Sequence, residues 1–473
     1  MEKIVNSSEP KKVLTAQEER LASGPVGKVL ASYAVPAVLS MLVNAIYNIV
    51  DQIFIGNVVG FLGNGATNVV FPLGIAVMAV AMLLGNGGAA YFSLRLGEQK
   101  HDLAKKCVVS SSIAIAVISV VMTVLIFIFF EPVCRLFGCT DQILPYAKQY
   151  GHIVLIGYPF VAVIMVLNAF IRTDGSPKRS MAAMLVGCFL NIILDPIFML
   201  VFDMGIEGAA LATIISQFVG LVYTLTYLNK FKTIKIEKKD IKVDFKVLKE
   251  SCSLGTSSFI SQAAMLFLMG LMNNSYVKYG SLSIYGPDIP LTAMGITSKI
   301  NQIIFSVANG IATGSQPIIG YNYGAGNIER VKKTFKTAIG ICATVMVIGV
   351  IVMEIFTQPI VNLFGSQADP LYNEFAVKCV RIFMLALVFG GVQGNIVVFF
   401  QAIGKPMRAL LLSSLRQIVL LLPCVLLLPL IFRDSLTGLM FSSPIADGLG
   451  CVVSVIFFIY QWKNLDKEVR LSK

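Results

Sequence analysis

Residues 87–106 read GGAAYFSLRLGEQKHDLAKK, residues 314–333 read GSQPIIGYNYGAGNIERVKK, and the two stretches align without a gap. They share a central glycine and close on a pair of lysines. A second motif also recurs half a chain apart, because residues 170–179 and 399–408 carry Phe, Gly, Pro and Arg at matching positions. The sequence therefore predicts an internal duplication.

The sequence on either side of these motifs is apolar enough for a membrane. Of the 473 residues, 56% are hydrophobic and only 14% are charged, whereas soluble domains carry about 25% charged residues. A bilayer core needs roughly 20 apolar residues per helix, so we predict an all-α polytopic membrane protein with about twelve transmembrane helices in two pseudo-symmetric six-helix bundles. The predicted spans cover about residues 30–55, 66–93, 107–130, 147–171, 180–202 and 207–228, and then 252–276, 290–315, 334–356, 375–402, 407–431 and 445–462.

Charged residues predict the orientation and the lobes. Basic clusters follow every second span, whereas the intervening loops carry mostly acids, among them Asp141, Asp203, Asp434 and Asp447. By the positive-inside rule both termini are cytoplasmic, and we expect the chain to lie in the cell membrane. The expected organisation is a tail (1–28), a first lobe of six spans (29–228), a basic linker (229–250), a second lobe of six spans (251–463) and a short tail (464–473).

Several classes of function lack their sequence signals. The net charge of +12 reflects the basic loops, and the lysine-rich linker lacks the interleaved aromatic residues of a nucleic-acid site. The glycine-bearing loops lack the G-x-x-x-x-G-K-[ST] pattern, so we expect no ATP and no cofactor. The nine cysteines are scattered without metal-ligand spacing, and although Cys134 and Cys139 share a loop and could pair, free thiols fit the pattern better. Since no His/Asp/Glu cluster or Ser/His pair is evident, we do not expect an enzyme.

Two aspartates interrupt the apolar spans of the first half. Asp51 lies in span one and Asp195 in span five, with Asn191 one helical turn before Asp195 and Pro196 loosening the helix beside it. A carboxylate at mid-membrane costs about 2.5–3.5 kcal/mol, which makes both aspartates candidate functional residues. Together with Thr213 in span six, they predict a set of oxygen ligands for Na⁺ or a proton. The structural alternatives are that Asp51 faces water at a helix end and that Asp195 caps its helix or pairs with a lysine.

The second half does not repeat this pattern. Its fifth span carries Arg416 and Gln417, and the eighth span of the chain carries Lys299. Amides and methionines accompany them, a combination that suits bulky amphiphilic ligands. For the two cations, snorkelling or an internal ion pair is the alternative. The predicted substrate-cavity residues are Tyr47, Gln262, Met265, Met269, Met272, Asn273, Asn274, Lys299, Gln302 and Arg416.

Several of these segments resemble one known family. VDQIFIG at 50–56, NIILDPIFM at 191–199, GIEGAALAT at 205–213, GYNYGAGNIERVKK at 320–333 and FFQAIGKPMRA at 399–409 are similar to segments of the multidrug and toxic compound extrusion (MATE) transporters, above all those of the bacterial branch around MepA and DinF. The resemblance covers nearly the whole chain. It implies two six-helix bundles arranged in a V, with a cavity between them.

The resemblance also implies a function and a site. Members of this family export cationic, aromatic drugs in exchange for H⁺ or Na⁺. Their coupling-ion residues fall on Asp51, Asn191, Asp195 and Thr213 of this chain, and a further tyrosine of theirs falls on Tyr150. We therefore expect an efflux antiporter that is a monomer in the lipid bilayer, takes small amphiphilic or cationic substrates, and binds H⁺ or Na⁺ at these residues.

Some features depart from the family or leave other functions open. Span seven lacks the acid that some branches carry, and span ten has Lys378 and Arg381, so a second ion site is not expected. A lipid-linked saccharide flippase of the same superfamily would need basic residues for pyrophosphate, for which Lys299, Arg381 and Arg416 are the candidates. An exporter of other metabolites and a non-transporting sensor are further alternatives. A facilitator-superfamily transporter would be expected to carry an Asp-Arg loop after span two, and this loop reads LGEQKHDLAKK.

Overall fold

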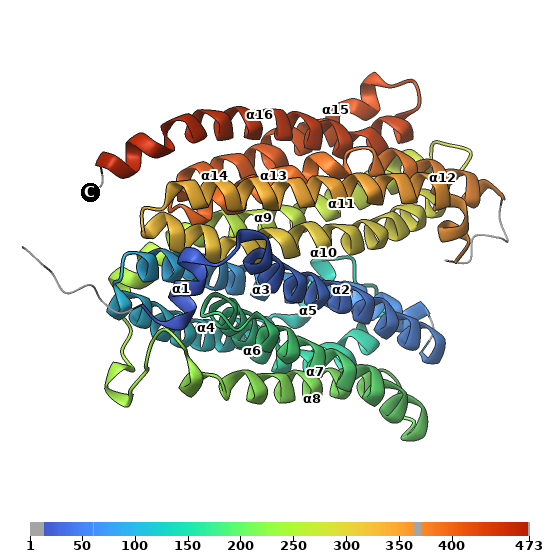
Figure 1. The fold of residues 1–473 in the computed structure, drawn as a ribbon. Coiled ribbons are helices and arrows are strands. Elements are labelled where there is room, and N and C mark those ends of the chain that lie inside the picture. Colours follow the sequence, from blue (N-terminus) through green and yellow to red (C-terminus); the bar gives the residue numbers. More distant parts are fainter. Residues whose placement is uncertain (1–13, 60, 364–369, 472–473) are drawn as a thin grey trace, which may run out of the picture.

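The computed structural model describes residues 14–59, 61–363 and 370–471, in which helices form nearly all of the structure (Figure 1). The first half contains α1 (Ala16–Ser23), α2 (Val26–Val58), α3 (Phe61–Gly97), α4 (His101–Ile128), α5 (Phe130–Leu136), α6 (Leu144–Thr173), α7 (Pro177–Pro196), the π-helical turn η1 (Ile197–Val201) and α8 (Gly205–Leu225). Two 3₁₀ turns, η2 (Leu228–Lys230) and η3 (Lys238–Asp240), follow in the linker. The second half contains α9 (Phe245–Gly280), α10 (Asp288–Gly324), α11 (Ile328–Leu363), α12 (Pro370–Met384), α13 (Leu387–Ala402), α14 (Pro406–Ser414), the π-helical turn η5 (Leu415–Leu421), α15 (Leu422–Ile431) and α16 (Ser435–Leu471).

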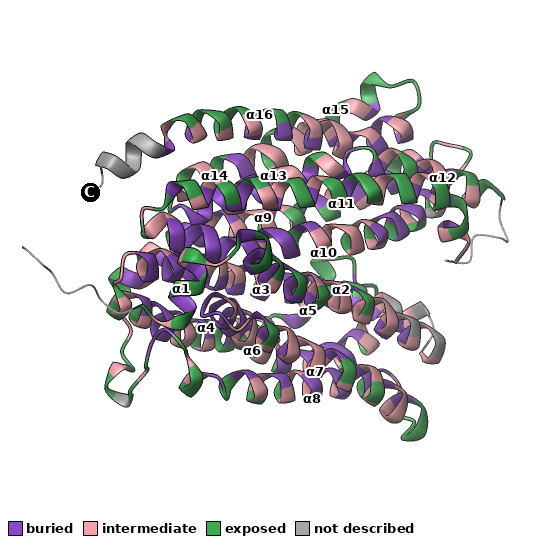
Figure 2. Ribbon diagram, viewed as in Figure 1, coloured by how far each residue is buried: buried purple, intermediate pink, exposed green. Residues whose placement is uncertain are grey.

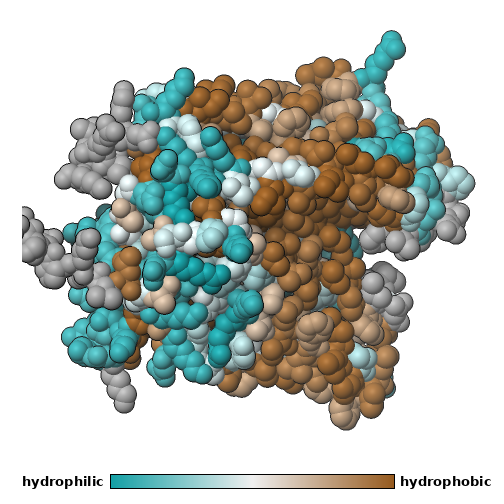
Figure 3. Space-filling view, viewed as in Figure 1, coloured by the Kyte–Doolittle hydropathy of each residue, from teal (hydrophilic) through white to brown (hydrophobic). Residues whose placement is uncertain are grey.

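Most of these helices match the predicted membrane spans. Ten helices in the described residues are long and apolar enough to cross a membrane, and α12 and α13, bent by 41° at a short break, bring the number to as many as eleven. The helix α10, which contains the predicted span 290–315, is not among the helices counted above. It has 37 residues but carries polar side chains such as Lys299, Gln302 and Gln316. The chain is thus an all-α, multi-pass membrane protein, with a broad apolar surface beside a hydrophilic end (Figure 3).

The second repeated motif forms the same turn in both halves. Gly175 and Gly404 follow α6 and α13 with φ angles of +88° and +73°, which glycine adopts without steric cost. The next helices, α7 and α14, begin at the matching residues Pro177 and Pro406. Proline suits the first turn of a helix because its missing N–H would have no partner there. The duplication thus extends from sequence to backbone geometry.

The two halves meet along α2, α3, α9 and α10. Gly97 of α3 and Gly324 of α10 occupy matching positions of the first repeated motif. A Cβ added at Gly97 would lie 2.0 Å from the carbonyl oxygen of Tyr321, and a Cβ added at Gly324 would lie 2.2 Å from that of Leu94. Leu94 and Tyr321 also occupy matching positions in the alignment. Each contact is therefore the counterpart of the other, with the two halves interchanged. The halves are thus related by pseudo-twofold symmetry.

These close contacts lie at one end of the molecule, where α1, the α3–α4 turn, the linker and the end of α16 are found (left in Figure 1). We call it the basic end, because the basic linker lies there. Buried residues also gather at this end (Figure 2). On α9, a Cβ at Gly255 would lie 1.9 Å from the carbonyl oxygen of Leu83, whereas Met269, about four turns along the same helix face, is 44% exposed. The interface is therefore tight at the basic end and uncovered farther along α9.

Some details differ from the predictions. Asp447, predicted to lie in a loop, is inside α16 and buried, because α16 begins at Ser435 rather than near residue 445. Part of the predicted polar tail 1–28 forms α1, with Leu21 buried in the core; residues 1–13 lie outside the described part of the chain. All nine cysteines are free thiols, so Cys134 and Cys139 are not paired.

Candidate functional site

Asp51 of α2 and Asp195 of α7 face each other inside the first half. Their side chains are within hydrogen-bonding reach of one another, and the two residues are only 8% and 0% exposed. Asp195 lies where α7 changes into the π-helical turn η1, next to Pro196, which cannot donate to the helix backbone. The irregular turn therefore fixes this carboxylate at an interruption of the helix, a place where functional residues are often found.

An amide and a hydroxyl complete the cluster. Asn191 Nδ2 donates to Asp195 Oδ1 at 3.2 Å and lies 3.3 Å from Thr213 Oγ1 of α8. Tyr150 of α6 is close enough to interact electrostatically with both carboxylates. The five residues predicted for an ion site thus lie together in the first half, contributed by four different helices.

Tyr47 also belongs to this cluster, although the sequence suggested the substrate cavity. Its hydroxyl lies within hydrogen-bonding reach of Thr213 and near both Asp51 and Asp195. The signal for this placement was present in the sequence, because Tyr47 lies four residues before Asp51 and therefore on the same face of α2.

Three oxygen atoms of the cluster are buried without a hydrogen-bond partner among the described residues: Asp51 Oδ1, Asn191 Oδ1 and Asp195 Oδ2. A buried acceptor without a donor is costly, and two adjacent carboxylates repel each other in a medium of low dielectric constant. A proton or a small cation between them removes both costs. Carboxylate, amide and hydroxyl oxygens suit such a hard cation. In the described part of the chain, no group of three or more His, Cys, Asp or Glu side chains is placed to hold a metal ion.

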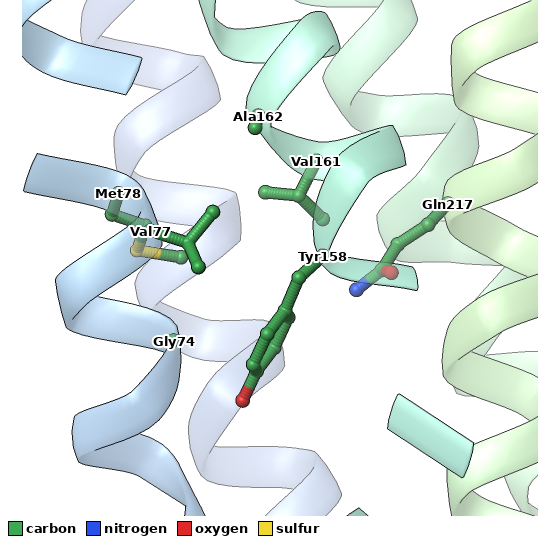
Figure 4. Close-up of a pocket in the computed structure, with 7 residues that line it drawn as sticks. All are labelled: Gly74, Val77, Met78, Tyr158, Val161, Ala162 and Gln217. Atoms are coloured by element: carbon green, nitrogen blue, oxygen red, sulfur yellow. The ribbon is translucent and has the colours of Figure 1, made fainter. Parts of the chain in front are cut away.

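The first half also contains a small cavity. It has a volume of about 50 Å³ and is lined by Gly74, Val77, Met78, Tyr158, Val161, Ala162 and Gln217 (Figure 4). Gln217 lies one helical turn beyond Thr213 on α8, on the side nearer the basic end. Its buried Oε1 has no hydrogen-bond partner among the described residues. The polar interior of the first half therefore extends beyond the carboxylates.

The predicted substrate-cavity residues divide into groups. Met265 and Met269 of α9 are 52% and 44% exposed, Asn274 and Gln302 are exposed, and Gln262 and Asn273 are half-buried. Lys299 is half-buried on α10, three turns before Gly310 on the face that contacts α2. Met272 is different because it is buried in the hydrophobic core, so it does not line an open surface in this structure.

Three cations named in the sequence analysis, Lys378, Arg381 and Arg416, form ion pairs in the second half. Arg416 Nε lies 2.6 Å from Asp447 Oδ1, which is the internal ion pair that the sequence left open. Its partner was missed because Asp447 was expected in a loop. Arg381 pairs with Glu354 at 3.6 Å and Lys378 with Asp434 at 3.3 Å. Two of the three cations available to a pyrophosphate-binding flippase are therefore neutralised by acids.

Known proteins resemble this chain over most of its length. The MatE family model matches residues 36–197 and 255–426, one block in each half. The Multidrug export protein MepA of Staphylococcus haemolyticus (strain JCSC1435) is 28% identical over 442 residues, which cover 92% of this chain and 94% of the relative. The protein of the same name from Staphylococcus aureus (strain MSSA476) is 27% identical with the same coverage.

Solved structures share the fold. An outward-facing multidrug resistance MATE family transporter of the MOP superfamily superposes with a TM-score of 0.89 at 23% identity, over 96% of this chain and 99% of that one. A MATE protein in the straight conformation gives a TM-score of 0.88 at 23% identity, over 96% of this chain and 100% of that one.

Proposed function

The chain belongs to the MatE family, and on this premise we propose that it is a secondary antiporter that exports amphiphilic or cationic compounds in exchange for H⁺ or Na⁺. The MepA relatives, which carry the name of multidrug export proteins, support this proposal. One observation carries it further: Asp51 and Asp195 face each other in a buried cluster with three unpartnered acceptor oxygens. Such a pair can exchange a proton or a Na⁺ ion, and Asn191 and Thr213 supply further oxygens for Na⁺.

The carboxylates can drive transport because they lie on different helices. A bound cation draws Asp51 of α2 toward Asp195 of α7, and its loss leaves the two charges repelling each other. α2 also packs against α10, where a Cβ at Gly310 would lie 2.5 Å from a side-chain carbon of Val38. A shift of α2 therefore changes the contact between the halves. Tenfold coupling needs a difference of about 1.4 kcal/mol in cation binding between two conformations.

The substrate would bind between the halves, on the uncovered face of α9. Met265 and Met269 offer flexible apolar contacts there, and Gln262 and Asn273 offer amides. Methionine-rich surfaces adapt to ligands of different shapes, which suits an exporter of several compounds. The basic end would face the cytoplasm of a cell whose plasma membrane holds the protein.

Reconstituted vesicles test this proposal. The full chain is placed in proteoliposomes, a pH gradient or a Na⁺ gradient is imposed separately, and the efflux of a fluorescent lipophilic cation is recorded. We expect Asp195→Asn and Asp51→Asn each to abolish gradient-driven efflux. The control is Asp141→Asn, which removes an exposed carboxylate paired with Arg135 and should leave efflux unchanged. Parent-like efflux by both cluster variants would contradict the ion site, and absence of flux in the parent would contradict the antiporter.

A further inference from the structure

The two copies of the first repeated motif each contact the segment that leads into the first long helix of the opposite half. In the second copy, Asn322 Nδ2 donates to the carbonyl oxygen of Leu21 at 3.0 Å. Arg330 Nε donates to the same oxygen at 2.7 Å, and Arg330 Nη2 donates to the carbonyl oxygen of Gly24 at 2.5 Å. Both acceptors belong to the end of α1, where helix carbonyls have no partner within the helix. Residues of α10 and α11 thus hold the segment that enters α2.

The first copy makes the reciprocal contact. Arg95 Nη2 of α3 lies 3.2 Å from Glu250 Oε2 in the first turns of α9, and Lys106 Nζ of α4 lies 3.2 Å from Asp244 Oδ2. Asp244 is also the N-cap of α9, since its side chain accepts from the backbone N–H groups of Lys246 and Val247. The α3–α4 region therefore holds the start of α9, as the α10–α11 region holds the end of α1.

α1 is itself fixed to the first half, so its bonds to Asn322 and Arg330 join the two halves. Gln17 Nε2 donates to the hydroxyl of Tyr33 in α2 at 2.5 Å. Glu18 is 1% exposed and accepts from Gln99 Nε2 of the α3–α4 turn at 3.1 Å. A capping box between Thr15 and Glu18 begins the helix. Because of these contacts, α1 would stay with the first half, and not with α10, if the halves separated.

We propose that these contacts are two latches that keep the basic end closed: an α1 latch (Leu21 and Gly24 with Asn322 and Arg330) and an α9 latch (Asp244 and Glu250 with Arg95 and Lys106). The proposal rests on the proposed antiporter function, because rocking of two similar halves around a central site requires the basic end to open at some stage. Opening then breaks both latches.

The α1 latch is the stronger of the two. Its acceptors are backbone carbonyls, which no change of pH can protonate, and its donor Arg330 presents a rigid fork to two of them. Both ion pairs of the α9 latch are partly exposed: 25% of the Arg95 side chain and 41% of the Glu250 side chain are accessible, and so are 51% of Lys106 and 29% of Asp244. Salt screens such a pair, and pairs of this kind contribute little.

Hydrogen–deuterium exchange of the full chain in lipid nanodiscs tests the latches. The double variant Asn322→Ala/Arg330→Ala loses every side-chain donor of the α1 latch. We expect exchange at the interface segments 83–97, 251–258 and 310–324 to rise roughly tenfold, the effect of losing hydrogen bonds made by a charged group. Arg330→Lys keeps the charge but not the fork and should show a smaller rise. Glu250→Gln, which weakens the α9 latch, should show a rise at 245–258 at low salt only.

The matched control is Arg381→Ala. It removes the contact of an arginine with Glu354, which lies within the second half, and should leave interface exchange at the parent value. Parent-like exchange in both the double variant and Glu250→Gln would overturn the proposal. If the double variant does not fold, Arg330→Lys and Glu250→Gln decide the outcome. Exchange is measured without substrate or gradient, so the latches can be present in a chain that fails the transport test, and absent from one that passes it.

Discussion

Arg416 and Asp447 form a partly buried ion pair between η5 and α16, and we expect its disruption to destabilise the fold. Asp447 has 8% of its side chain exposed and Arg416 has 27%. Replacing Arg416 by alanine leaves an unpaired carboxylate inside the second half, which costs about 3 kcal/mol or more. The variant Arg416→Ala should therefore melt at a clearly lower temperature in a thermal-unfolding assay in detergent.

The double variant Arg416→Met/Asp447→Leu separates pairing from packing. Because both charges are removed and the volume is kept, its melting temperature should return close to that of the parent. Transport by the double variant should keep its dependence on Na⁺ or pH, since the proposed cation site lies in the other half. A double variant as unstable as the single one would contradict this account of the pair.

At the residue scale, the sequence predicted which polar residues of the first half lie together, but not the ion-pair partner of Arg416 in the second half. Asn191 and Asp195 share a face because they are four residues apart, and polar groups in an apolar helix must find one another, so their meeting with Thr213 could be predicted. The pairing of Arg416 with Asp447 could not be predicted, because the position of Asp447 depends on where α16 begins. Lys299 shares a helix face with Gly310, but no local rule says what covers that face.

At the scale of elements, the irregular end of α7 predicts a trade between stability and activity. Pro196 lacks an N–H and lies directly before η1. The variant Pro196→Ala restores a backbone donor, and proline inside a helix is about 3 kcal/mol less favourable than alanine. We expect a higher melting temperature together with slower cation-driven efflux in proteoliposomes, because a regular helix would hold Asp195 in a different direction.

Pro359→Ala is the control for this element. Pro359 lies inside α11, near the non-helical backbone of Phe356 and in the half without the carboxylate cluster. This variant should also gain stability but should keep the parent's rate of cation-driven efflux. If the two proline variants slowed efflux equally, the role assigned to η1 would be wrong.

The ends of the helices could be predicted where the turn chemistry is specific. The matching Gly-x-Pro turns before α7 and α14 follow directly from the aligned motifs. Hydropathy alone missed α1, a helix of eight residues whose polar Glu18 is buried through hydrogen bonds to Gln99 and Thr15. It also missed the bend between α12 and α13, since a continuous apolar segment carries no sign of a break.

At the scale of the whole molecule, the repeat predicted two similar halves but not which end of their interface is closed. In the proposed antiporter the same residues would serve conformations open at either end, so one sequence would encode both. Besides the proposed latches, the backbones approach closely at the closed end: α3 and α9 cross where a Cβ on Gly87 would lie 2.2 Å from the carbonyl oxygen of Ser251. Glycine is required wherever two helices approach so closely.

This crossing yields a prediction for the whole molecule. Gly255→Ala places a Cβ 1.9 Å from the carbonyl oxygen of Leu83, which is backbone and cannot move aside as a side chain can. Overpacking costs typically about 1–3 kcal/mol, which is enough to change the ratio of the populations of two conformations about tenfold. The halves should separate at the basic end, so that amide exchange in residues 245–258 rises and efflux from proteoliposomes falls. Gly394→Ala, where no atom lies within 4 Å of the added carbon, should change neither. Unchanged exchange in Gly255→Ala would mean that the glycines do not hold the halves together.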